Sequence, residues 1–224
     1  MTKQNIKNEF LTISTANFHG ICDELAAKDK DLQSVILAHG YPPLWTRPNT
    51  FETLVHVILE QQVSLASALA ALKKLAEKTG GITPQAILAL NDEELRTCYV
   101  SRQKTVYIRE LANALQNETI NLDRLTTLSN DEIRAKVTQL KGIGHWTTDV
   151  YLMFVLQRAD IFPIGDLAAV NALKRIKRLP KETAREDSLK ITEQWKPYRT
   201  VASFILWHYY LSTVGKKMLQ KEAK

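Results

Sequence analysis

The sequence predicts an all-α fold, and three observations carry that prediction. Apolar residues recur at helical spacing through most of the 224 residues, which is typical of helices that bury one face. No convincing run alternates between apolar and polar residues, so strands are not indicated. Ser, Thr, Asn or Asp precedes many apolar segments, where the side chain can cap the first turn of a helix. We therefore expect a bundle of roughly ten helices.

Capping residues, glycines and prolines divide the first half of the chain into helices. The expected helices cover about residues 15–27 (after Ser14 or Thr15), 31–39, 51–61, 65–78 and 84–90, and a further helix follows Asn91. Residues 1–13 are polar, and we expect them to be partly ordered at best. The prolines of residues 41–48 exclude a helix there, because proline lacks an amide donor and restricts its neighbours. That segment reads as an extended connector.

The second half continues in the same way. The expected helices cover about residues 102–116, a segment opened by Ser129, and residues 145–156, 167–179, 186–195 and 198–213. We expect two lobes: a core of residues 41–224 divided into a middle lobe (50–165) and a C-terminal lobe (166–224), with residues 1–40 packing against the C-terminal lobe.

Composition limits the possible classes of protein. The net charge of +6 and the sequence pI of about 9.2 favour an acidic partner, although many soluble proteins are equally basic. The two cysteines, Cys22 and Cys98, lack metal-ligand spacing and read as small buried thiols. No apolar run approaches a membrane span and the N-terminus is no signal peptide, so we expect a soluble intracellular protein. We also expect it to be a monomer.

The most informative stretch covers residues 140–166. The turn LKGIG contains Gly142 and Gly144, and an apolar segment follows it. A turn of this kind presents free N–H groups at the start of a helix, which is a ready site for an anion. Asp166 lies 20 residues beyond Trp146, directly before a new helical pattern. The stretch thus combines a phosphate-binding turn with a single carboxylate, although local sequence alone favours a plain helix N-cap for Asp166.

The segment LKGIGHWT resembles the helix-hairpin-helix turn of the DNA glycosylase superfamily, whose signature is that hairpin, a Gly/Pro-rich loop and a catalytic aspartate. The wider pattern is similar to the 3-methyladenine DNA glycosylase II (AlkA-like) branch. It comprises FETLV at 51–55, QQVS at 61–64, SRQK at 101–104 and WKPYR at 195–199. The resemblance spans about residues 41–215. Some members carry an N-terminal β-domain, for which too little sequence precedes Tyr41.

The resemblance implies a two-lobed helical bundle with a cleft between the lobes. It implies a DNA repair glycosylase that hydrolyses the N-glycosidic bond of alkylated purines, of the 3-methyladenine and 7-methylguanine type, in duplex DNA. Asp166 would stabilise the cation that forms on the sugar. Members that also cut the strand have a lysine where this chain has Trp146. We therefore expect a monofunctional enzyme that leaves an abasic site.

The remaining site residues follow by position. The base pocket would include Trp146, Trp207 and Tyr151, although aromatic residues at helical spacing are more often core. DNA contacts are expected from the hairpin residues Lys141, Gly142, Gly144, His145, Thr147 and Thr148. Gln62 matches the wedge that fills the space of the extruded base, but it also reads as an ordinary polar turn residue.

The family requires no cofactor, but a monovalent cation can bind the hairpin through backbone carbonyls, which here belong to Thr138, Leu140 and Ile143. The expected partner is double-stranded DNA with a damaged base, in a bacterial cytoplasm beside the nucleoid or in a eukaryotic nucleus. Three alternatives remain: a non-catalytic hairpin DNA-binding module, a superfamily glycosylase for deaminated or oxidised bases, and a helical adaptor for protein partners. Two cysteines exclude the four-cysteine iron–sulfur site of endonuclease III-type relatives.

Overall fold

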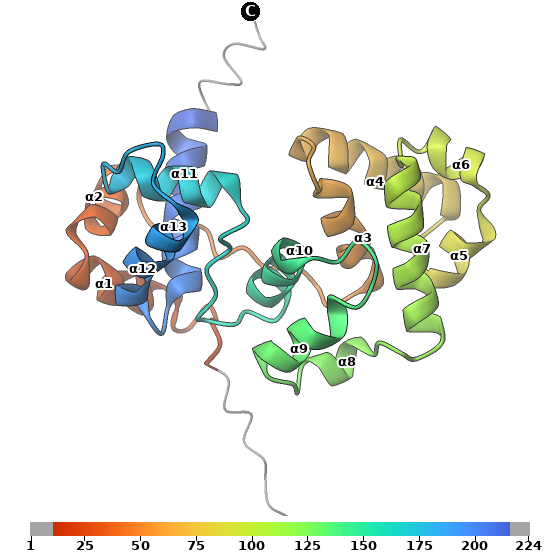
Figure 1. Cartoon of the computed structure of the whole chain (residues 1–224), viewed down its shortest axis with the longest axis horizontal. Helices are drawn as coiled ribbons and strands as arrows, with labels where there is room; N and C mark the ends of the chain where they lie inside the picture. Colours follow the sequence, from red (N-terminus) through yellow and green to blue (C-terminus); the bar gives the residue numbers. More distant parts are fainter. Residues whose placement is uncertain (1–10, 216–224) are drawn as a thin grey trace, which may run out of the picture. The chain divides into compact units, whose positions relative to one another are not determined.

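The computed structural model describes residues 11–215, which fall into two compact units (Figure 1). Residues 47–156 form one unit, called here the hairpin unit because it contains the predicted turn. Residues 11–46 and 157–215 form the other, called here the Asp166 unit. The division therefore falls between Leu156 and Gln157, nine residues before the expected boundary at 165/166 (165 − 156), and the Asp166 unit includes the N-terminal helices.

The hairpin unit is built around one buried helix. Its helices are α3 (Phe51–Glu60), α4 (Leu65–Thr79), α5 (Pro84–Ala89), α6 (Asp92–Thr97), α7 (Arg102–Gln116), α8 (Leu122–Leu125), α9 (Asn130–Val137) and α10 (His145–Val150), followed by the π-helical turn η1 (Tyr151–Val155). Helix α3 packs against α4, α7 and α10. Most of its apolar side chains are buried, including Val55, Val57 and Ile58 with no exposed surface. The hairpin is thereby fixed to a rigid core.

The Asp166 unit is organised around its last helix. It contains α1 (Phe18–Lys28), α2 (Lys30–His39), α11 (Leu167–Ile176), α12 (Arg185–Thr192), the 3-10 turn η2 (Glu193–Trp195), α13 (Arg199–Tyr210) and the π-helical turn η3 (Leu211–Gly215). Helices α1, α2 and α11 all pack on α13. Residues 200–206 of α13 are buried without exception. This helix joins segments from both ends of the chain in one core.

The predicted all-α class is confirmed. Over residues 11–215 there is no strand, and the only bridge is an isolated antiparallel pair between Thr12 and Arg158. The expected N-caps accept a backbone N–H at the start of their helices: Thr50, Ser64, Thr83, Asn91, Ser101 and Ser129. Cys22 and Cys98 are buried free thiols. No helix in the described part of the chain is long and apolar enough to cross a membrane.

Several expected helix boundaries were wrong; for example, the helix expected over 167–179 ends at Ile176. The first helix begins at Phe18 rather than after Ser14 or Thr15, because Asn17 accepts the N–H of Ser14 and closes a separate turn. The helix expected over 145–156 changes to π-helical geometry at Tyr151, and the last helix does so at Leu211. The short helix α8 was not expected at all. Residues 1–10 of the expected polar N-terminus lie outside the described residues.

Candidate functional site

The hairpin turn lies between α9 and α10 and depends on glycine at one position. Gly142 has a φ of +90°, and a Cβ on it would lie 2.0 Å from Cγ of Tyr107, whose ring comes from α7. A side chain is therefore excluded both by the backbone conformation and by the neighbouring ring. The N–H of Ile143 donates to the carbonyl of Leu140 at 3.1 Å and closes the turn.

Several N–H groups of the turn are available to a ligand. Those of Gly142, Gly144, His145 and Thr147 make no hydrogen bond to another of the residues that the structure describes. Gly144, His145 and the nearby Lys141 are exposed. A Cβ on Gly144 would meet nothing within 4 Å, so this glycine leaves space rather than relieving strain. Open N–H groups at a helix start, next to lysine, suit an anion such as a phosphate.

The two threonines of α10 differ from each other. The backbone N–H of Thr147 is available to a ligand, as described above. Its side chain is buried, and its Oγ1 accepts a hydrogen bond from Nε2 of Gln61 at 3.0 Å. Thr148 is fully buried, and both its N–H and its hydroxyl donate to the carbonyl of Gly144. The expected DNA contact of Thr148 is thus corrected, because its donors are used within the helix.

Gln61 connects the α3–α4 turn to the hairpin. Its Nε2 donates to the carbonyl of Gly142 at 2.8 Å as well as to Thr147. The neighbouring Gln62, the expected wedge, is exposed and has a φ of +57°. That left-handed conformation is uncommon for a residue with a long side chain. One glutamine of the pair therefore fixes the turn, and the other projects from it.

An ion pair joins the two helices of the hairpin. Arg134 of α9 lies 2.5 Å from Oδ1 of Asp149 on α10, and the side chain of Asp149 is 5% exposed. Burial raises the pKa of the Asp149 carboxyl, against the opposing effect of the Arg134 and His145 charges. A buried carboxylate of this kind depends on its cation, so Arg134 and Asp149 hold the hairpin helices together.

The two aromatic residues expected on α10 and η1 also differ in exposure. Trp146 is half-buried at the start of the hairpin helix. Tyr151 is only 2% exposed, and its hydroxyl donates to Oδ1 of Asn49 at 2.9 Å within the same unit. These are the surroundings of a core residue, and they do not support the expected place of Tyr151 in the base pocket.

Two of the three carbonyls expected to bind a cation have a free oxygen in the described part of the chain. Within residues 11–215, the carbonyls of Thr138 and Ile143 accept no hydrogen bond, whereas that of Leu140 accepts the N–H of Ile143. Carbonyl oxygens are suitable ligands for a hard monovalent cation, so this donor set fits one. No group of three or more His, Cys, Asp or Glu side chains that could hold a metal occurs in the described chain.

Asp166 is the N-cap of α11 and lies at the end of a tight turn. Its N–H donates to the carbonyl of Pro163 at 2.8 Å. Its Oδ1 accepts the N–H of Ala169 at 2.8 Å and the indole N–H of Trp207 at 3.0 Å. Two rigid N–H donors from different helices therefore orient one half-buried carboxylate. Such a group can stabilise a nearby positive charge or orient a water molecule.

Trp207 belongs to an aromatic cluster. Its ring stacks on that of Phe204, with a centroid distance of 5.9 Å, and meets the ring of Trp45 edge-on at 6.4 Å. Trp45 and Trp207 are both half-buried. The sequence analysis did not include Trp45 among the site residues. The feature that could have pointed to it is a large aromatic side chain within a proline-rich connector.

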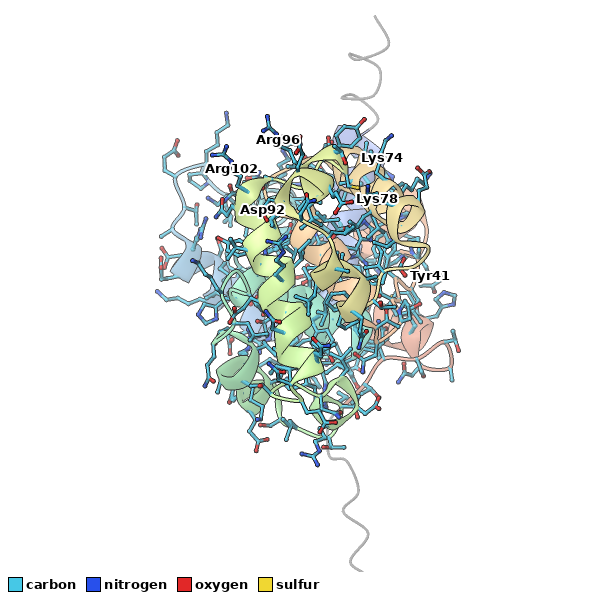
Figure 2. All side chains as sticks on the ribbon, turned by 90° about the vertical axis from the view of Figure 1, so that its right-hand side faces the viewer. Tyr41, Lys74, Lys78, Asp92, Arg96 and Arg102 are labelled. Atoms are coloured by element: carbon cyan, nitrogen blue, oxygen red, sulfur yellow. The ribbon has the colours of Figure 1, made fainter. Side chains whose placement is uncertain are left out.

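The structure brings Asp166 and Trp207 together in the Asp166 unit, whereas Trp146, Gln62 and the other expected DNA contacts belong to the hairpin unit. Basic residues also gather elsewhere on the hairpin unit. Figure 2 shows Lys74 and Lys78 of α4, Arg96 of α6 and Arg102 of α7 at the surface. Positive charge alone therefore does not identify the anion-binding turn.

A turn with open N–H groups between two short helices is the arrangement of a helix-hairpin-helix protein, and the same chain carries an oriented carboxylate in its other unit. The family model described as "HhH-GPD superfamily base excision DNA repair protein" matches residues 55–197. The chain belongs to this family, as the hairpin motif predicted.

Known relatives agree with the family. "DNA-3-methyladenine glycosylase 1" of Schizosaccharomyces pombe is 32% identical over 209 residues, which cover 90% of each chain. A Bacillus subtilis relative is 28% identical over 184 residues, and the match covers 79% of this chain and 64% of that protein. Among solved structures, a 3-methyladenine DNA glycosylase from S. pombe in complex with abasic DNA has a TM-score of 0.77 and 29% identity, covering 84% of this chain and 95% of that one.

Proposed function

We propose that this protein is a monofunctional DNA glycosylase, which hydrolyses the bond between deoxyribose and an alkylated purine in duplex DNA and leaves an abasic site. The similarity to relatives named DNA-3-methyladenine glycosylase supports the substrate class. The purines are of the 3-methyladenine and 7-methylguanine type, whose positive charge makes the base a good leaving group.

The observation that carries the proposal is the doubly hydrogen-bonded carboxylate of Asp166. Cleavage of the glycosidic bond leaves positive charge on the sugar, much as in glycoside hydrolysis. A carboxylate already oriented by Ala169 and Trp207 needs no reorganisation when that charge develops. The same group can orient the attacking water or accept its proton. N-capping and catalysis are thus compatible roles for Asp166.

The residue at the start of the hairpin helix supports a monofunctional reaction. Strand cleavage by this superfamily needs an amine that forms a Schiff base with the sugar, and Trp146 has none. Trp146 is proposed instead as an aromatic contact for the base. In the Asp166 unit, Trp207 offers a second indole, because electron-rich rings attract cations over their faces.

Phosphate binding is assigned to the hairpin turn, with the N–H groups of Gly142, Gly144, His145 and Thr147 as donors. A monovalent cation held by the carbonyls of Thr138, Leu140 and Ile143 would add positive charge beside the phosphate. Gln62 is proposed to fill the space of the extruded base. The protein would act as a monomer in whichever compartment holds the DNA.

A base-release assay tests the proposal. Duplexes with methylated, deaminated or oxidised bases are incubated with the protein, and released bases are identified by chromatography. We expect release of methylated purines and strand breaks only after heat or alkali. Release of oxidised or deaminated bases alone would move the protein to another substrate class. A covalent adduct trapped by borohydride would contradict the monofunctional assignment.

A further inference from the structure

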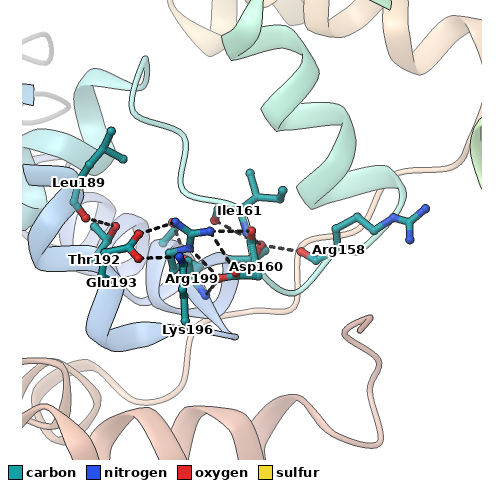
Figure 3. A network of polar contacts seen from close by, with 10 residues as sticks. Arg158, Asp160, Ile161, Leu189, Thr192, Glu193, Lys196 and Arg199 are labelled. Carbon is teal, nitrogen blue, oxygen red and sulfur yellow. Dashed lines mark hydrogen bonds and ion pairs between the residues drawn. The ribbon is translucent and has the colours of Figure 1, made fainter. Parts of the chain in front are cut away.

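The loop that leads to Asp166 is fastened to the first turn of α13 (Figure 3). Nε of Arg199 lies 2.7 Å from Oδ1 of Asp160, and Nη2 lies 3.0 Å from Oδ2. A two-point contact between guanidinium and carboxylate fixes orientation as well as distance. Glu193 contacts Arg199 through the other terminal nitrogen, with Oε1 3.1 Å from Nη1.

The next residue of α13 fastens the backbone of the same loop. The buried hydroxyl of Thr200 donates to the carbonyl of Arg158 at 2.6 Å and accepts the N–H of Ile161 at 3.0 Å. The N–H of Thr200 donates to the carbonyl of Ala159 at 2.9 Å. Residues 158–161 are thus attached to α13 by both backbone and side chain.

The same helix holds the far end of the loop through Trp207, which donates to Asp166. From Thr200 to Trp207 an α-helix rises about 10 Å. The six residues from Asp160 to Asp166 can span about 20 Å when extended. The length of the segment therefore does not fix its path by itself, and the attachments at its two ends restrict where the carboxylate can lie.

We propose that Asp160 and Arg199 are a positioning pair, which fixes the carboxylate of Asp166 for base excision by attaching its loop to the helix that carries Trp207. This inference rests on the proposed glycosylase function. The pair acts through Asp166 and touches no substrate itself.

The ion pair between Asp160 and Arg199 is partly exposed to solvent, so it is expected to contribute to the position of the loop more than to the stability of the fold. The side chains of Asp160 and Arg199 are 30% and 19% exposed. An ion pair that is partly open to water adds little to the free energy of unfolding. Loss of the pair should therefore alter geometry more than stability.

The test is the single-turnover rate of base release by Asp160→Asn, measured with excess enzyme on a methylated duplex. We expect a fall of about 10- to 100-fold, because small misplacement of a catalytic group has effects of this size. Affinity for the duplex should change less than about threefold, since phosphate contacts dominate it. Arg199→Lys, which keeps the charge but not the two-point contact, should give an intermediate rate.

Glu193→Gln is the matched control, because Glu193 touches Arg199 but not the loop. Its rate should match that of the unaltered protein. The Asp160→Asn change should cost more in a Trp207→Phe background than alone, because Trp207→Phe removes the second attachment of the same segment. A rate for Asp160→Asn equal to that of Glu193→Gln would overturn the proposal. So would a fall in rate fully explained by a lower fraction of folded protein.

Amide hydrogen exchange of residues 162–166 gives a readout independent of activity. Exchange should be at least about tenfold faster in Asp160→Asn and unchanged in Glu193→Gln. If the unaltered protein released no base but exchange changed as expected, the glycosylase assignment would fail while the attachment stood. If amide exchange of residues 162–166 were unchanged in Asp160→Asn, the claim that the ion pair holds this segment would be wrong.

Discussion

Gly142 and Gly144 lie two residues apart in one turn, and each is glycine for a different reason. Gly142 has a positive φ and lies against the ring of Tyr107, where a Cβ would be 2.0 Å from the nearest atom. Gly144 has an extended backbone, and a Cβ there would meet nothing within 4 Å. The first glycine serves the fold, and the second leaves room for a ligand.

Alanine substitutions should separate these two roles. Gly142→Ala should lower the free energy of unfolding by several kcal/mol, about 2–4 in all, because it adds both strain and a clash. Gly144→Ala should leave that free energy within about 0.5 kcal/mol but weaken duplex binding, because the new methyl group lies beside the proposed phosphate donors. Urea unfolding and fluorescence anisotropy measure the two quantities. Equal stability of the two variants would contradict this account.

At the residue scale, sequence reasoning located the turn, its glycines and Asp166 as a helix cap. It could not locate Tyr107, whose ring lies against Gly142 although it is 35 residues away. It also assigned Thr148 to DNA, because spacing does not reveal that its two donors are used by the carbonyl of Gly144. Contacts between distant side chains depend on packing, and a local pattern does not contain them.

At the scale of elements, the α3–α4 turn and the hairpin form one assembly. Gln61 joins them through the carbonyl of Gly142 and the hydroxyl of Thr147, while Gln62 projects to solvent. The sequence predicted Gln62 as the wedge and assigned no role to Gln61. In the structure Gln61 connects the two turns, and it is the half-buried residue of the pair.

Variants of the two glutamines should behave in opposite ways. Gln61→Met leaves two acceptors without their donor and should cost about 1–2 kcal/mol of unfolding free energy. Gln62→Gly suits the positive φ at that position and should keep this free energy within about 1 kcal/mol, yet it should slow base release. Chemical unfolding measures the free energy of unfolding of each variant, and single-turnover kinetics measure its rate of base release. A Gln61→Met variant with unchanged stability and normal activity would contradict the structural role proposed for Gln61.

The helix caps from Thr50 onward were predicted correctly, because each depends on residues within one turn, whereas the cap expected at Ser14 or Thr15 was wrong. Changes of helix type at Tyr151 and Leu211 were not predicted, because no Pro or Gly marks the first of them. The role of α13 was also beyond the sequence, since the bonds from Arg199 and Thr200 to the loop at 158–161 span about forty residues.

At the scale of the whole molecule, a buried polar network closes the Asp166 unit across distant parts of the chain. Asp29 accepts bonds from Nζ of Lys177 at 2.7 and 2.6 Å and from Nε1 of Trp195 at 2.7 Å. Burial alone would raise the pKa of Asp29, but these hydrogen bonds and the Lys177 charge outweigh it and lower the pKa below its ordinary value of 3.8. The N-terminal helices are thus tied to the C-terminal part of the chain.

Because of this network, part of the free energy of unfolding depends on pH. Because the pKa of Asp29 is lower in the folded state, its contribution is present above pH 3.8 and is lost as the pH falls further. Asp29→Asn should cost about 3 kcal/mol at pH 7, and the difference from the unaltered protein should shrink below pH 3.8. Asp31→Asn is the control, because Asp31 binds the same lysine from a more exposed position. A difference that grew in acid would contradict the assignment.

The sequence predicted two lobes, with the N-terminal helices grouped with the C-terminal ones. The compact units of the structure divide at Leu156/Gln157 instead of 165/166, because the loop before Asp166 is fastened to α13 rather than continuing the hairpin unit. Phosphate donors therefore belong to one unit and the carboxylate to the other, so binding and chemistry should be separable by mutation.

The most direct test is the Asp166→Asn variant, which keeps an N-capping oxygen but removes the negative charge. Base release from methylated duplex DNA and duplex affinity are measured on the same preparation. Our account predicts that release is abolished while affinity stays within about tenfold, because phosphate contacts dominate binding. Retained excision would contradict the assignment of Asp166 as the group that stabilises the sugar cation.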